Sequence, residues 1–390
     1  MIRQLFVLYF ISLFFLSCAV EETRIITGAD RTSDYLSLLK DKKVAVTANQ
    51  TTLIGKTHLV DSLISLGVDI RLIFAPEHGF RDLADAGEKI AGGVDEKTGV
   101  KVVSLYGTEF KPLPQDLEDI DIVIFDIQDV GARFYTYIST MHYVMEACAE
   151  NGKQLIVFDR PNPNGFYFDG PVREPAFRSF VGMHPVPVVH GMTIGEYARM
   201  VNEEGWLEGG IRCDLTVIEC LNYTHSTYYE LPVKPSPNLP NQNSVYLYPS
   251  ICFFEGTNIS LGRGTDAPFQ MFGAPEFEGI FDYSFTPQST AGAKNPPLLG
   301  KMCFGKDLRD ATEKGLVPSG KLDLSWVIEA YKAFPDTSKF FRKYFDTLAG
   351  TTKLREQIAS GMNAEEIRKT WESDLEGFAL VRKKYLLYSE

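Results

Sequence analysis

The sequence predicts an α/β protein with a doubly wound, mostly parallel sheet, followed by a smaller C-terminal α+β domain. Apolar runs of strand length alternate with amphipathic helical stretches, which is typical of a parallel sheet. Four of these runs stop abruptly at a polar cluster. Ligands bind outside the carboxyl ends of the strands in open α/β sheets, so we expect these clusters to share one rim.

The individual elements follow from apolar periodicity and from helix start and stop signals. Helices are predicted over residues 57–66 and 138–150, because each is followed by a glycine that can end a helix. Thr193, with Glu196 three residues later, forms a capping box and predicts a helix over residues 194–203. The predicted strands are residues 43–48, 71–75, 100–105, 121–126, 154–158, 186–189 and 214–219.

A proline-rich stretch divides the chain into two parts. Pro232, Pro235, Pro237 and Pro240 lie close together and predict an extended connector. The predicted domains are therefore residues 24–240 and residues 241–390. In the second domain we expect strands near Phe285 and Met302 and helices at residues 325–334, 352–360 and 364–387.

Residues 1–23 are predicted to be a lipoprotein signal peptide and tether. Arg3 precedes an apolar run over residues 5–16, which is too short to span a bilayer and fits a secretory signal. The run ends in Phe-Leu-Ser-Cys, which resembles a bacterial lipobox with Cys18 as the lipidated residue. We therefore expect a membrane-anchored protein of the cell envelope, on the periplasmic side or at the outer membrane. The alternative is a plain signal peptide with an incidental cysteine.

Several function classes are disfavoured. The net charge of −12 and the lack of a basic run argue against a nucleic-acid partner. No CxxC motif or Cys/His cluster signals a metal site, and no glycine-rich nucleotide fingerprint follows the first strand. A GxSxG nucleophile elbow is also absent. We therefore expect no metal and no cofactor.

The polar clusters are rich in carboxylates, amides and aromatic residues, a mixture that suits carbohydrate chemistry. Glycoside cleavage generally needs two carboxyl groups. Glu77, which follows a predicted strand, is the expected acid, although it could instead pair with Arg81. The second carboxylate is left open between Asp126 and Asp129. Asp126 could instead cap a turn, and Asp129 could pair with Arg133.

Other residues of these clusters are candidates for substrate binding. Arg263 lies in a glycine-rich loop and could capture a carboxylate with two parallel hydrogen bonds, or could pair with Asp266. Asp159 and Arg160 could form a self-paired turn, and His190 could be a core histidine. The full candidate set at this point is Gln128, Arg133, Asp159, Arg160, Asn162, His190, Glu255, Asn258, Arg263 and Thr265.

These motifs together resemble the NamZ-type exo-β-N-acetylmuramidases. The matching segments are APEHGFR, FDIQDVGARFYTYI, FDRPNPNG, HGMTIGE, PSPN and EGTNISLGRGTDAPF, in this order along the chain. The resemblance implies a Rossmann-like N-terminal domain, a smaller C-terminal domain and a cleft between them. Glu77 matches the glutamate of the family's EHG motif, which the resemblance implies is catalytic, and His78 beside it at the strand end is a further catalytic candidate. Tyr135, Ser236 and Asn238, which lie in the matching motifs, are further substrate-binding candidates.

The activity that the resemblance implies is release of N-acetylmuramic acid from the non-reducing end of peptidoglycan fragments. A lipoprotein that binds muropeptides without turnover is the competing function. An amidase or peptidase acting on the same polymer is disfavoured, because zinc and serine signatures are missing.

Overall fold

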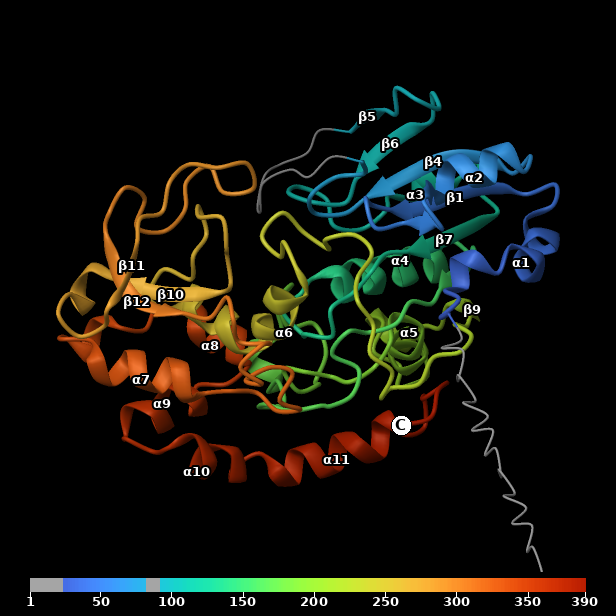
Figure 1. Cartoon of the computed structure of the whole chain (residues 1–390). Helices are drawn as coiled ribbons and strands as arrows, with labels where there is room; N and C mark the ends of the chain where they lie inside the picture. Colours follow the sequence, from blue (N-terminus) through green and yellow to red (C-terminus); the bar gives the residue numbers. More distant parts are fainter. Residues whose placement is uncertain (1–23, 82–91) are drawn as a thin grey trace, which may run out of the picture.

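The computed structural model describes residues 24–81 and 92–390, and it confirms the predicted fold class (Figure 1). Within these residues, seven strands form one sheet in the order β5-β6-β4-β1-β7-β8-β9, and only β5 runs antiparallel to its neighbour. The strand order reverses between β1 and β7, which defines the switch point of a doubly wound sheet. The strands are β1 (Lys43–Ala48), β4 (Asp69–Ala75), β5 (Gly93–Val94), β6 (Lys101–Ser104), β7 (Ile122–Asp126), β8 (Gln154–Phe158) and β9 (Asp214–Ile218).

Helices cover both faces of this sheet. On one face, α1 (Thr32–Leu39) and α2 (Leu59–Ser65) pack on strand side chains such as Val44 and Val46. On the other, α4 (Tyr137–Glu150) and α5 (Ile194–Glu203) share a core with Ala45. Successive strand residues therefore enter opposite cores, which explains the nearly continuous apolar runs in the sequence. Shorter elements here are β2 (Leu53–Ile54), β3 (Thr57–His58) and α3 (Pro114–Leu117).

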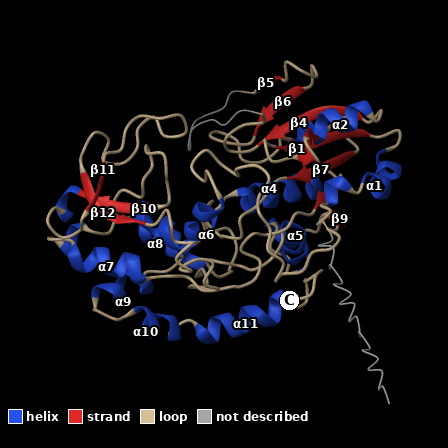
Figure 2. Cartoon of the chain, in the orientation of Figure 1, coloured by secondary structure: helices blue, strands red, loops and turns tan. Residues whose placement is uncertain are grey.

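The C-terminal part is built on a small antiparallel sheet in the order β10-β12-β11, with helices below it and loops above it in the view of Figure 2. Its strands are β10 (Met271–Ala274), β11 (Tyr283–Phe285) and β12 (Cys303–Asp307). Its helices are α6 (Gln242–Ile251), α7 (Ser325–Ala333), α8 (Tyr344–Ala349) and α9 (Lys353–Ala359). The sequence did not predict α6, which contains Pro249. The domain boundary at residue 240 stays a prediction.

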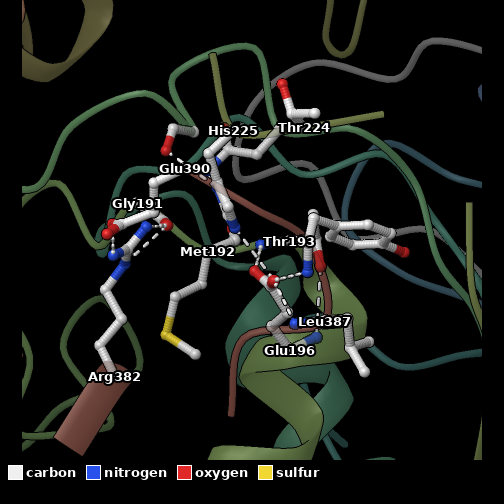
Figure 3. Close-up of polar contacts among 12 residues, drawn as sticks. Gly191, Met192, Thr193, Glu196, Thr224, His225, Arg382, Leu387 and Glu390 are labelled. Atoms are coloured by element: carbon white, nitrogen blue, oxygen red, sulfur yellow. Dashed lines mark hydrogen bonds and ion pairs between the residues drawn. The ribbon is translucent and has the colours of Figure 1, made fainter. Parts of the chain in front are cut away.

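The last helices return from the C-terminal part to the N-terminal sheet domain. In Figure 1, α10 (Ala364–Lys369) and α11 (Glu372–Arg382) run along the lower side of the molecule toward α5. Figure 3 shows where they arrive: the Arg382 guanidinium donates to the carbonyl of Gly191 at 2.9 and 2.7 Å. The backbone N–H of Leu387 donates to Glu196 Oε1 at 2.8 Å. We call residues 382–390 the C-terminal strap.

Two predicted elements are wrong. Residues 186–189 are not a strand of the main sheet, because β9 occupies the position beside β8, and Val189 instead bridges Ala132 and Asp169. The helix predicted over residues 364–387 is interrupted between α10 and α11. Trp371 lies at the interruption, and its indole N–H donates to Asp169 Oδ1 at 3.1 Å. Among the helices of the described residues, none is long and apolar enough to cross a membrane.

Candidate functional site

A cavity of about 200 Å³ is lined by residues from both the N-terminal and the C-terminal part. Two carboxylates line it, Glu77 and Glu255, together with one guanidinium, that of Arg263. Its aromatic lining comprises Tyr106, Phe134, Tyr135, Tyr137, Phe180, Tyr248, Phe269 and Tyr344. The other lining residues are His78, Thr136, Val181, Ser236, Asn238 and Leu239.

Glu77 reaches the cavity because the chain turns sharply after β4. His78 and Gly79 both have positive φ, at 72° and 89°. This conformation is costly for a residue with a Cβ, so the turn at His78 must be held by its surroundings. The Thr136 hydroxyl donates to Glu77 Oε2 at 3.3 Å. Burial, together with the charge of Glu77 and a hydrogen bond to it, raises the pKa of Tyr106. Glu77 therefore lies between hydroxyl groups that fix its direction.

The alternative that Glu77 pairs with Arg81 is wrong, because Arg81 has other carboxylate partners. Its Nη2 lies 2.6 Å from Asp61 Oδ1, and its Nε lies 2.8 Å from Asp95 Oδ1. Burial alone would raise the pKa of Asp61, but hydrogen bonds from Arg81 and Lys97 lower it to about 2. This network anchors the chain just after the EHG turn and leaves the Glu77 carboxylate directed to the cavity.

Glu255 is the second carboxylate of the cavity, and Arg263 fixes its orientation. Arg263 donates from Nε at 2.8 Å and from Nη2 at 2.5 Å to the same oxygen, Glu255 Oε1. The other oxygen, Oε2, has the Cys252 thiol at 4.0 Å. The Arg263 guanidinium also lies over the Phe269 ring, 4.9 Å from its centroid. The expected alternative, a pair between Arg263 and Asp266, is therefore wrong.

The aromatic residues form mutually braced walls. Tyr135 and Tyr137 pack edge to face with ring centroids 4.9 Å apart, and Phe134 packs in the same way on Tyr248 at 5.5 Å. The Tyr135 hydroxyl donates to the carbonyl of Pro235 at 2.8 Å, which ties this wall to the proline-rich connector. Aromatic faces beside carboxylates suit a sugar ring, whose apolar C–H face can pack while its hydroxyls are hydrogen-bonded.

The structure brings seven of the predicted site residues together at this cavity: Glu77, His78, Tyr135, Ser236, Asn238, Glu255 and Arg263. Asn238 also has a bracing contact, since its Nδ2 donates to the carbonyl of Gly292 at 2.8 Å. The remaining predicted residues do not line the cavity.

Asp126 is not placed as the second catalytic carboxylate. It is fully buried, and Arg160 holds it with Nε at 2.5 Å from Oδ1 and Nη2 at 2.8 Å from Oδ2. Asp159 instead caps α5, accepting from the Thr193 hydroxyl at 2.7 Å and from the backbone N–H of Gly195 at 2.8 Å. The strand ends of β7 and β8 are therefore occupied by structural contacts.

Asp129 is also outside the cavity. Its Oδ2 accepts from the backbone N–H of Gly131 at 2.7 Å and lies 3.4 Å from His190 Nε2. Gln128 and Asn162 both donate from their side-chain amides to backbone carbonyls, those of Pro161 and Met192. Asn258 and Thr265 likewise bond backbone carbonyls, those of Lys339 and Gly262. These polar groups support loops and do not face the cavity.

Arg133 was expected to bind substrate or to pair with Asp129, and the structure contradicts both. Its side chain is fully buried, and its guanidinium donates to the carbonyls of Pro171, Val186, Leu348 and Ala349. A basic residue near an acidic one in sequence suggested an ion pair, but the backbone directs the two side chains to different partners.

Comparison with known proteins shows to which family the chain belongs. Residues 44–243 match the family model for the N-terminal domain of the exo-β-N-acetylmuramidase NamZ, and residues 246–388 match the model for its C-terminal domain. The chain belongs to the NamZ family. The resemblance seen in the motifs is thus confirmed.

NamZ relatives cover almost the whole chain. The peptidoglycan β-N-acetylmuramidase NamZ of Bacillus subtilis strain 168 is 40% identical over 94% of this chain and 92% of its own. A crystal structure of a DUF1343 family protein from Bacteroides fragilis is 46% identical, with a TM-score of 0.88 over 94% of this chain and all of that one. A second such protein from the same organism is 29% identical, with a TM-score of 0.79 over 94% and 99%.

Sequence reasoning missed several cavity residues of this NamZ-family chain. Tyr106 comes just after β6, so the same strand-end rule that selected Glu77 could have found it. Thr136 and Tyr137 lie inside a quoted motif but were not singled out. Tyr248 and Tyr344 lie on α6 and α8, where no local pattern marks a cavity residue. Within residues 24–81 and 92–390, no group of three His, Cys, Asp or Glu side chains could hold a metal ion.

Proposed function

We propose that this protein is an exo-acting glycosidase that releases N-acetylmuramic acid from the non-reducing end of peptidoglycan fragments. The observation that carries the proposal is the pair of carboxylates, Glu77 and Glu255, in one small aromatic-walled cavity. The B. subtilis relative, which is named for β-N-acetylmuramidase activity on peptidoglycan, supports the substrate class.

Glu77 is the group proposed to act as the acid. It donates its proton to the glycosidic oxygen as the C1–O bond breaks, so that the leaving sugar departs as a neutral alcohol. The Thr136 hydroxyl, 3.3 Å from Glu77 Oε2, holds the carboxyl in place. Water supplies the new hydroxyl group at C1. Glu255, not Asp126 or Asp129, is the partner carboxylate that the cavity offers for this step.

Arg263 is proposed to bind the lactyl carboxylate, the group that distinguishes N-acetylmuramic acid from N-acetylglucosamine. It is the only guanidinium that lines the cavity among the described residues. Its Nε and Nη2 are directed to Glu255, and no hydrogen bond from Nη1 to another described residue is present. A charge-assisted contact with the lactyl group contributes roughly 1.5 to 3 kcal/mol.

The test is turnover of a chromogenic β-N-acetylmuraminide by the purified protein, compared with the matching β-N-acetylglucosaminide. We expect hydrolysis of the muraminide to dominate. The competing function, capture of muropeptides without turnover, predicts saturable binding of the muraminide by calorimetry and no release of the chromophore.

We also propose that the protein is lipid-anchored through Cys18 in the cell envelope. The support is the short apolar run at residues 5–16 that ends in Phe-Leu-Ser-Cys, which lies outside the described residues. Cys18→Ser should move the protein out of the detergent-extracted membrane fraction, and mass spectrometry should find a diacylglyceryl cysteine at the native N-terminus. A native N-terminal peptide that carries no lipid and begins elsewhere would refute the anchor.

A further inference from the structure

Arg133 has an unusual set of partners for a buried cation. Its side chain is fully buried, yet the four hydrogen bonds that its guanidinium makes within the described residues all go to backbone carbonyls. Nη1 donates to Pro171 at 2.9 Å and to Val186 at 2.6 Å. A buried charge is normally paired with an opposite charge, because desolvation without compensation is costly. Because no such partner is among the contacts of Arg133, another feature must stabilise its guanidinium.

The C-terminal end of α8 is the feature that stabilises the Arg133 guanidinium. Nη2 of Arg133 donates to the carbonyls of Leu348 at 2.9 Å and Ala349 at 2.7 Å. The last carbonyls of a helix lack intrahelical partners and carry the negative end of the helix dipole, so a cation there is favourable. Gly350, at φ 73°, follows directly, and a Cβ at this position would lie 2.8 Å from Arg133 Nη2. The guanidinium thus caps the C-terminal end of α8 and packs closely against Gly350.

The other end of α8 lies at the cavity. Its first residue, Tyr344, lines the cavity, and burial, followed by the charge of Glu255, raises the pKa of its phenol. The next residue, Phe345, packs tightly on Gly256, since a Cβ on Gly256 would lie 2.3 Å from Phe345 Cα. The helix is therefore held between Gly256, beside Glu255, and the Arg133 guanidinium.

Arg133 also belongs to the opposite wall of the same cavity. It immediately precedes Phe134, Tyr135, Thr136 and Tyr137, all of which line the cavity. Its backbone N–H donates to the carbonyl of Val188 at 2.7 Å, which fixes the residue within the N-terminal domain. One side chain therefore connects the wall that carries Thr136, the partner of Glu77, with the helix that carries Tyr344.

We propose that Tyr344 binds the substrate sugar through its hydroxyl in the cavity that Glu77 and Glu255 also line, and that Arg133 is the positioning residue that sets Tyr344 there by holding α8. This inference rests on the proposed glycosidase function. It assigns Arg133 a role at the interface of the two domains, without any contact between Arg133 and the substrate.

The test is a double-mutant cycle on kcat/KM for the chromogenic β-N-acetylmuraminide. Tyr344→Phe should lower kcat/KM by about tenfold, the value of one hydrogen bond to substrate. Arg133→Lys keeps the charge but cannot reach four carbonyls, and it should cause a loss of similar size in the wild-type background. In the Tyr344→Phe background the same substitution should cost less than about threefold, because the group it positions is already missing.

A matched control separates positioning from loss of stability. Arg382 is also buried, and its guanidinium donates to the carbonyl of Gly191 and to the carboxylate of Glu390, neither of them on α8. Arg382→Lys should lower the melting temperature as Arg133→Lys does, but its effect on kcat/KM should be equal in both Tyr344 backgrounds. If Arg133→Lys fails to fold, Gly350→Ala, whose Cβ crowds both Arg133 Nη2 and the Arg173 side chain without removing either guanidinium, enters the same cycle.

Three outcomes would overturn the inference: full activity of Tyr344→Phe, full activity of a folded Arg133→Lys, or losses that multiply independently in the double variant. Each of these leaves wild-type hydrolysis intact. Failure of the proposed function is a different result, because the wild-type protein would then release no chromophore from the muraminide.

Discussion

Arg263 directs both its Nε–H and its Nη2–H to a single oxygen of Glu255, Oε1. The usual arrangement of such a pair places one donor on each carboxylate oxygen. Within the described residues, the one hydrogen-bond partner that this arrangement leaves to Oε2 is the Cys252 thiol, at 4.0 Å. Glu255 is therefore oriented by one oxygen and can present the other to a substrate or a water molecule.

We predict that Glu255→Gln lowers kcat for the muraminide by at least about a hundredfold, because the amide keeps the shape of the side chain but cannot take up charge or a proton. The melting temperature should change little. The control is Glu313→Gln, the same chemical change at an exposed position. A Glu255→Gln variant that retains kcat would exclude this carboxylate from catalysis.

Removing Arg263 should change selectivity as well as rate. Arg263→Ala releases Glu255, so turnover of both chromogenic sugars should fall. The loss should be about tenfold larger for the muraminide, so the muraminide-to-glucosaminide ratio of kcat/KM should fall by about tenfold. Arg263→Lys keeps the charge without the planar fork and should lower the ratio partially. Arg309→Ala, which removes an exposed guanidinium paired with Asp307, is the control. An unchanged ratio would show that Arg263 only braces Glu255.

Glu77→Gln should abolish turnover, with a loss of at least about a hundredfold in kcat, while the fold stays intact. The amide still accepts the Thr136 hydrogen bond but cannot donate a proton as a carboxylic acid does. Glu109→Gln, an exposed change near the same edge of the sheet, serves as the comparison. Near-normal kcat/KM in a stable Glu77→Gln protein would remove Glu77 from the acid role.

Stability should fall as the pH drops from about 6.5 to about 4, in part through His58. Burial, followed by the charge of Arg81, lowers the pKa of His58 to about 4, whereas an unfolded histidine titrates near 6.5. Below pH 6.5 His58 of the unfolded chain becomes protonated, whereas the buried His58 of the folded protein stays neutral. The free energy of unfolding therefore falls as the pH drops.

His58→Gln should therefore flatten this part of the stability curve by up to about 3 kcal/mol. The measurement is urea unfolding at pH 7, 5.5 and 4. His184, whose pKa is also lowered by burial, adds to the same slope, so the variant should remove only part of it. Parallel curves for the two proteins over this range would contradict the prediction.

The C-terminal strap should contribute to stability through Glu196. This fully buried carboxylate accepts from the backbone N–H groups of Thr193 at 2.9 Å and Leu387 at 2.8 Å, and it lies 3.0 Å from His225 Nε2. Glu196→Ala leaves these donors without their acceptor and should cost roughly 3 kcal/mol or more in urea unfolding. Glu203→Ala, an exposed change at the end of the same helix, should cost far less.

The sequence was sufficient for six of the seven strands of the main sheet and for part of the site, because both depend on local patterns. Apolar runs marked the strands, and the abrupt end of β4 marked Glu77. The same rule failed at Asp126 and Asp159, because a strand end can be filled by a neighbouring guanidinium or by a helix N-terminus. Nothing in a single sequence shows which polar residues meet each other and which remain free for a ligand.

The C-terminal contribution to the cavity could be predicted only in part. The glycine-rich loop indicated Glu255 and Arg263, since glycines and charged residues occurred together. Tyr344 depends on how α8 packs against Gly256 and Arg133, which is a tertiary relationship. The partners of Arg133 are backbone carbonyls, which every residue type has, so the amino-acid sequence does not indicate them.

The strap also has a consequence for the order of events during synthesis. α5 ends at Glu203, but Glu196 receives the backbone N–H of Leu387, and Asp159 receives the Tyr388 hydroxyl at 2.6 Å. The ribosome must therefore add the whole C-terminal domain before these two buried carboxylates have all their donors. The nascent N-terminal domain cannot reach its final stability on its own, and its last folding step waits for a segment that is translated long after the sheet itself.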